Sequence, residues 1–211
     1  MALFREHVTV GAIISMIVVV AAYFYALVTD PLLLAILFGI TIIGSFLPDV
    51  DSDSGVPFYL VFGGVTLAVT GVVLLYTLAL RPDDVRFLVG VPLAAMLGCW
   101  FIIGGIIKKL THHRGIYHSL PALLIAGIAT YLMSERYGLD EITALIFGSA
   151  MAVGFASHLF LDEIHAGITL DGIPFNPNKA FGSALKLFSH SSMVNIATYS
   201  LLAVLLYTAI Q

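Results

Sequence analysis

The chain has 211 residues, of which 60% are apolar and only 10% are charged. Soluble domains average about half apolar and about a quarter charged, and a compact domain of this length cannot hide so much apolar surface from water. The composition therefore excludes an ordinary soluble protein, a disordered chain and a collagen-like fibre, and it indicates an integral membrane protein. The single cysteine, Cys99, excludes an internal disulfide and a cysteine-based zinc site. A net charge of −4 gives no reason to expect a nucleic-acid partner.

Seven segments without Asp, Glu, Lys or Arg approach or exceed the roughly 20 helical residues that cross a bilayer core. They are 8–28, 32–47, 57–80, 87–107, 119–133, 142–161 and 191–210. Their apolar character is continuous rather than alternating, which predicts helices and not barrel strands. We therefore expect an all-α integral membrane protein with about seven transmembrane helices and a metal site at one membrane face. Residues 1–211 form one transmembrane domain, in which 162–190 is a loop or interfacial segment over the site.

Seven spans place the N-terminus and the loops 48–56, 108–118 and 162–190 on one side of the membrane. That side carries six of the nine Lys and Arg residues. Because positive charge favours the cytoplasmic side, we expect this face to be cytoplasmic in a protein integral to the cell membrane.

All seven histidines fall on or near this same face, whereas the opposite loops contain none. They are His7, His112, His113, His118, His158, His165 and His190. Imidazole and carboxylate side chains together are common ligands of divalent cations. The asymmetry therefore predicts a metal site at this face.

The spacing of two of these groups suits metal binding. His158 and Asp162 are four residues apart and share one face of a helix. Asp49 and Asp51 follow Pro48, and an extended segment there would aim both carboxylates to one side.

His113 and His118 are five residues apart, which does not align on a regular helix. His113 fits a ligand in a loop and His118 fits a ligand in the first turn of the next helix, with Gly115 allowing the bend between them. Pro121 suits the first turn of the helix that follows.

Each group also has a simpler explanation. His7 alone could be an interfacial residue, and residues 49–53 could form a solvated turn or a helix cap. The histidines of 112–118, beside two lysines, could be a basic patch that binds anionic lipid headgroups. His158 and Asp162 could make a hydrogen bond at a helix end. The joint occurrence on one face favours the metal site.

Three motifs, Leu47-Pro48-Asp49-Val50-Asp51, 113-HRGIYHS-119 and 157-SHLFLD-162, resemble the LexA-regulated, membrane-bound metal-dependent hydrolase family (YdjM-like). That family has LPD-x-D, HRG-x-x-HS and SH-x-x-x-D elements in this order, and His7 matches its N-terminal histidine. The chain departs from the family after Asp162, where His165-Ala166-Gly167 stands in place of Thr-x-x-Gly. His165 is therefore either an additional ligand or a bystander. A looser similarity, to zinc-dependent phospholipase C and related nucleases, is an analogy of fold.

The resemblance implies one or two divalent ions, zinc first and manganese second, held by seven donors. These are His7, Asp49, Asp51, His113, His118, His158 and Asp162. A metal pair would activate water for attack on a phosphoester. Asp49, Arg114 and Asp162 are the expected catalytic residues, with Asp49 as a bridge and Arg114 as a phosphate clamp or a partner of Asp53. Ser119 is the expected hydrogen-bond partner of a ligand histidine.

The substrate is inferred from location. Phe181, Leu185 and Phe188 have helical spacing, so 179–190 would lie in the membrane interface or simply connect two spans. An interfacial segment favours a membrane lipid or lipid-linked phosphoester as substrate. The alternative function is a divalent-metal-binding transporter or sensor, which the absence of charges within the spans disfavours.

Overall fold

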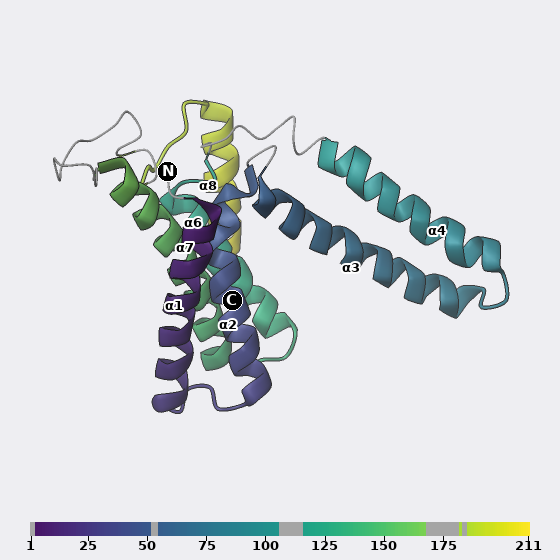
Figure 1. The fold of residues 1–211 in the computed structure, drawn as a ribbon, viewed down its shortest axis with the longest axis horizontal. Coiled ribbons are helices and arrows are strands. Elements are labelled where there is room, and N and C mark those ends of the chain that lie inside the picture. Colours follow the sequence, from purple (N-terminus) through teal and green to yellow (C-terminus); the bar gives the residue numbers. More distant parts are fainter. Residues whose placement is uncertain (1–2, 52–54, 106–115, 168–181, 183–184) are drawn as a thin grey trace. The chain divides into compact units, whose positions relative to one another are not determined.

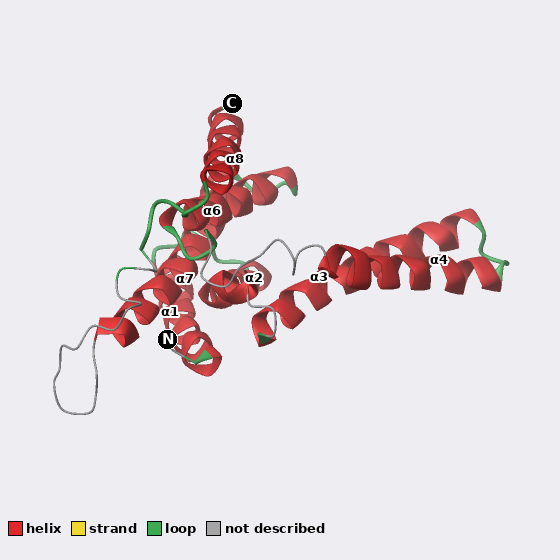
Figure 2. Ribbon diagram, turned by 90° about the horizontal axis from the view of Figure 1, so that it is seen from above, coloured by secondary structure: helices red, strands yellow, loops and turns green. Residues whose placement is uncertain are grey.

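The protein's fold was analysed in a computed structural model that describes residues 3–51, 55–105, 116–167, 182 and 185–211. Within these residues the regular elements are all helices (Figures 1 and 2). They are α1 (Phe4–Phe24), α2 (Pro31–Phe46), the 3₁₀ helix η1 (Leu47–Asp51), α3 (Val56–Leu80), α4 (Val85–Leu97), the π-helical segment η2 (Gly98–Ile103), α6 (Leu120–Arg136), α7 (Glu141–Gly167) and α8 (Ser192–Ile210). Each of the seven predicted spans corresponds to one described α-helix, which confirms the all-α membrane fold.

Six of these segments are long and apolar enough to cross a membrane. The remaining helix, α6, has 17 residues, so it spans about 26 Å of a hydrocarbon core about 30 Å thick. Prolines open several helices as predicted: Pro31, Pro57 and Pro121 each lie in the first two positions of a helix. Proline is tolerated there because the N–H that it lacks would have no partner within the helix.

The chain divides into two compact units. The first contains Met1–Pro48 and Arg114–Gln211, with α1, α2, α6, α7 and α8. Helix α7 is its centre, because α1, α2 and α6 all pack against it and α8 packs on α6. Its buried apolar residues include Phe147, Phe155 and Leu159.

The second unit, Asp49–His113, contains the paired helices α3 and α4 with η2. Phe58, Phe62 and Cys99 form its buried apolar cluster. The hydroxyl of Thr66 donates to the sulfur of Cys99 at 3.4 Å. A single-domain organisation of residues 1–211 remains a prediction from sequence.

Two local predictions are wrong. The segment after Pro48 is not extended, since Leu47–Asp51 continues α2 as a 3₁₀ helix; the fixed φ of proline is compatible with that conformation. Residues 185–190 are not helical. Their backbone is bonded to neighbouring helices instead: Leu120 N–H donates to the Lys186 carbonyl at 3.1 Å, and the Tyr199 hydroxyl donates to the Leu187 carbonyl at 2.9 Å.

Glycines allow α1, α2 and α7 to approach closely. A Cβ atom on Gly154 would overlap the Thr41 carbonyl, and one on Gly44 would lie 2.6 Å from the Met151 carbonyl. A Cβ atom on Gly11 would overlap the Ser45 hydroxyl. Small residues at such contacts are the usual means by which membrane helices pack backbone against backbone.

We expect Gly154→Ala to lower the thermal stability of the detergent-solubilised protein, because the obstructing Thr41 carbonyl belongs to the backbone and cannot rotate away. Overpacking of this kind costs about 1–3 kcal/mol. Gly39→Ala on α2 is the matched control, since nothing lies within 4 Å of its Cβ position. Equal melting temperatures for the two variants would contradict this account of the packing.

Candidate metal centre

Four candidate ligands converge where α1 begins, α6 begins and α7 ends. His7 lies in the second turn of α1, and His158 and Asp162 are one turn apart near the end of α7. His118 immediately precedes Ser119, the N-cap of α6. All four side chains are buried, with exposed fractions of 0–2%. Three imidazoles and one carboxylate are thus gathered into the interior of the first unit from α1, from α7 and from the residue before the N-cap of α6.

The Asp162 carboxylate is the common neighbour of the three rings. Its Oδ1 lies 3.5 Å from His7 Nε2, and its Oδ2 lies 3.9 Å from both His118 Nε2 and His158 Nε2. These separations exceed the usual length of a direct N–H···O hydrogen bond, about 2.7–3.2 Å. The three Nε2 atoms therefore face the carboxylate across distances longer than a direct hydrogen bond.

The orientation of His158 is fixed by α2. Its Nδ1 lies 2.9 Å from the Ser45 carbonyl oxygen. A carbonyl can only accept, so Nδ1 carries a proton, and Nε2 is the ring nitrogen that faces Asp162. A histidine whose second nitrogen donates to a backbone carbonyl has the arrangement typical of metal ligands.

Charge considerations favour neutral rings around a cation. The rings of His7 and His158 are stacked, with centroids 3.7 Å apart and an interplanar angle of 13°. Two imidazolium ions stacked in a buried site would repel strongly. A positive charge beside a buried carboxylate in turn stabilises it. One divalent cation among the four groups satisfies both conditions.

The spacing fits such a cation. Ligand atoms about 2.1 Å from a tetrahedral zinc lie about 3.4 Å from one another, close to the 3.5 Å between His7 and Asp162. His7, His158 and Asp162 offer atoms that all lie within 4.8 Å of one another. The donor set suits zinc or manganese.

The glycine contacts bring these ligands together. Gly11 is one turn from His7 on α1, and Gly154 is one turn from His158 on α7. Gly44 precedes Ser45, which orients the His158 ring. Close backbone packing of the three helices therefore sets the distances within the site.

The sequence profile of the YdjM inner membrane protein family matches residues 1–211, the whole chain. The chain belongs to this family. Comparison with curated proteins and with solved structures gives no match. Membership confirms the resemblance drawn from the three motifs, and it supports a location in the inner membrane.

Only part of the three YdjM-like motifs lies within the residues that the structure describes. Four of the seven predicted ligands lie together as described above. His113 and Arg114 lie outside the described residues, as does His112. Asp49 lies in η1 with a half-buried side chain, one residue after the first unit ends. Asp51 completes η1, and its ligand role, like that of Asp49, remains a prediction.

Three other residues singled out in the sequence of this YdjM family member have surroundings that differ from those of the four buried groups. His165 pairs with Glu6 rather than with the four buried groups. His190 is exposed. The prediction that Ser119 bonds a ligand histidine is not borne out by its described bonds, because its hydroxyl donates to the Ile116 carbonyl and accepts from Ala122 N–H. As N-cap of α6 it fixes the turn that carries His118.

Sequence reasoning missed one contributor to the site. The Ser45 carbonyl acts through its backbone, so no residue-type signal could have shown it.

We expect His158→Ala and Asp162→Ala to lose bound metal while His190→Ala retains it. Loss of a supporting contact alone weakens metal binding about 10–100-fold, so removal of a ligand should reduce the metal content of purified protein at least as much. Elemental analysis after purification without chelator and resupply with zinc or manganese measures this. Equal metal content in all three variants at matched folding would contradict the assignment.

Proposed function

We propose that this protein is a membrane-embedded, metal-dependent hydrolase that acts on a phosphoester or lipid-headgroup bond. The observation that carries the proposal is the convergence of His7, His118 and His158 on the buried Asp162 carboxylate. Their side chains would hold one divalent ion, with zinc preferred and manganese as the alternative. Asp49, Asp51 and His113 are the proposed further ligands, and they would permit a second ion.

A bound divalent cation supplies Lewis acidity and lowers the pKa of water. The residues of the chain do the remaining work. His158 is held in the liganding tautomer by the Ser45 carbonyl, and the buried position of Asp162 excludes bulk water from its carboxylate. Arg114 is proposed to bind a phosphate oxygen through its planar guanidinium group.

A lipid or lipid-linked substrate is supported by the surroundings of the site. Leu187 and Phe188 are 50% and 63% exposed, and the backbone of this segment is bonded to the start of α6 through Lys186 and Leu120. Exposed apolar and aromatic side chains at the ends of membrane helices favour the lipid–water interface. A headgroup bond would therefore be at the level of the site.

A second candidate function is divalent-metal binding without hydrolysis, as in a transporter or sensor. The near-complete burial of the four described ligands favours it, because a catalytic ion needs an open position for water and substrate. The two candidates differ in activity and not in metal content.

We expect Asp49→Asn to lose most hydrolytic activity, because it keeps the shape of the side chain but removes the charge proposed to bridge two cations. Two divalent ions about 3.5–4 Å apart repel by about 17–19 kcal/mol even at an effective dielectric near 20, so the pair would separate. The assay is hydrolysis of phospholipids and a generic phosphodiester by metal-loaded protein. Asp83→Asn is the control, as an exposed carboxylate between α3 and α4.

Full activity of Asp49→Asn would remove Asp49 from the site. Inactive metal-loaded wild type, over a broad panel of lipids and phosphoesters, would instead favour the non-enzymatic function.

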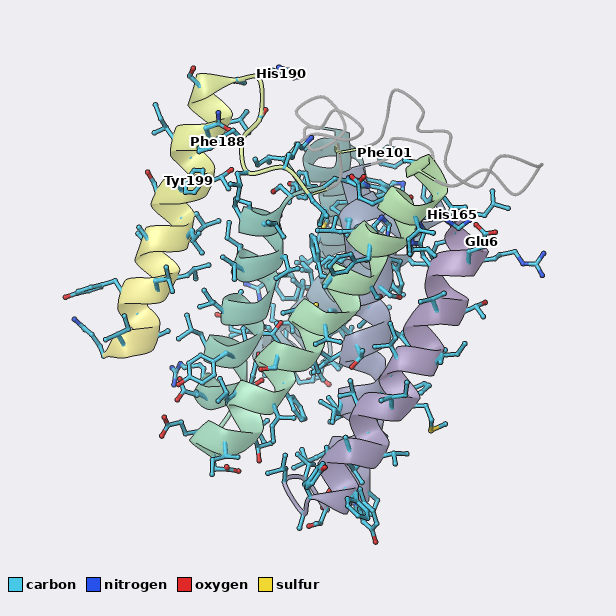
Figure 3. All side chains as sticks on the ribbon, turned by 90° about the vertical axis from the view of Figure 1, so that its left-hand side faces the viewer. Glu6, Phe101, His165, Phe188, His190 and Tyr199 are labelled. Carbon is cyan, nitrogen blue, oxygen red and sulfur yellow. The ribbon has the colours of Figure 1, made fainter. Side chains whose placement is uncertain are left out.

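The metal face is proposed to be cytoplasmic. His190 lies at the same end of the first unit as Glu6 and His165 (Figure 3). We expect a cysteine at position 190 to react with an impermeant thiol reagent only after the cells are permeabilised. A cysteine at position 137, between α6 and α7, should react in intact cells; Tyr137 is 82% exposed. The reverse pattern would show that the metal face is periplasmic.

A further inference from the structure

Glu6 and His165 form a second contact between α1 and α7. Figure 3 shows their side chains next to one another where α1 begins and α7 ends. Glu6 Oε2 lies 3.6 Å from His165 Nε2, and the side chains are 45% and 35% exposed. The four buried ligands do not include either residue.

Both side chains are held in place by their own helices. His165 Nδ1 lies 3.0 Å from the Leu161 carbonyl, which can only accept, so Nδ1 carries the proton. Nε2 is therefore the ring nitrogen that faces Glu6. The Glu6 carboxylate accepts from Leu3 N–H at 2.5 Å, as part of the cap of α1. Two potential ligand atoms, a ring nitrogen and a carboxylate oxygen, are thus oriented toward one another.

The arrangement repeats the chemistry of the buried site. His7 on α1 faces Asp162 on α7 at 3.5 Å, and Glu6 on α1 faces His165 on α7 at 3.6 Å. His165 is three residues beyond Asp162, which is about 4.5 Å along the helix. The buried pair is 1% and 2% exposed, whereas the outer pair is open to solvent.

We propose that Glu6 and His165 form a second, solvent-accessible site for a divalent cation, here called the outer site. A separation of 3.6 Å is too long for a direct hydrogen bond and is close to the roughly 3.4 Å between neighbouring ligands of a tetrahedral ion. One imidazole and one carboxylate suit zinc, cobalt or manganese, and the exposure of the pair leaves room for water ligands. With two protein ligands the outer site is weaker than the buried one. The proposal of an outer site does not depend on the protein having hydrolytic activity.

The test is calorimetric titration of Co²⁺ and Zn²⁺ into the full-length protein in detergent, after chelator treatment. Wild type should bind a weaker ion in addition to the tightly held one. Glu6→Gln and His165→Gln should each weaken that binding about tenfold or more, in the range seen for lost ligand support, and should keep the tight ion. His190→Gln, an exposed histidine at the same end of the first unit, is the matched control.

Equal affinity for the weaker ion in wild type and both variants, or no weaker ion in wild type, would overturn the outer site. His158→Ala separates this inference from the proposed metal centre, because it should lose the tight ion and keep the weaker one. A protein that binds only the weaker ion, in a manner sensitive to Glu6→Gln, would support the outer site and refute the buried centre.

Discussion

A buried carboxylate facing three imidazoles is the constraint on which the rest of the site depends. Asp162 is 2% exposed, and the Nε2 atoms around it lie 3.5–3.9 Å away. The Ser45 carbonyl accepts from His158 Nδ1, so the Nε2 atom of that ring faces the Asp162 carboxylate in the interior. A positive charge beside a buried carboxylate stabilises it. A divalent cation held by these groups is proposed to supply that charge.

The membrane fold explains how so polar a cluster is built in so apolar a chain. Membrane helices gain little from apolar contact with one another, so they associate through close packing and polar bonds. Gly44 and Gly154 let α2 and α7 meet backbone to backbone, and Gly11 lets α1 pack on the Ser45 side chain of α2. Each glycine lies within one turn of a residue that forms or orients the candidate site. The same contacts that hold the bundle together therefore determine the ligand distances.

Much of this could be read from the sequence, because apolar runs and helical spacing are local properties. The seven spans and the shared face of His158 and Asp162 needed no tertiary information. The Ser45 contact and the Glu6–His165 pair could not be predicted, since they depend on how α1, α2 and α7 pack. The predicted loop 162–190 begins too early, because α7 runs to Gly167; Asp162 and Glu163 end the apolar segment but not the helix.

The most direct measurement of the central claim is X-ray absorption spectroscopy of the zinc-loaded, detergent-solubilised protein. The account predicts a first shell of nitrogen and oxygen at about 2.0–2.1 Å, with outer-shell scattering from about three imidazoles that falls by one in His158→Ala. A shell of water oxygens without imidazole scattering, or a spectrum unchanged by His158→Ala, would contradict it.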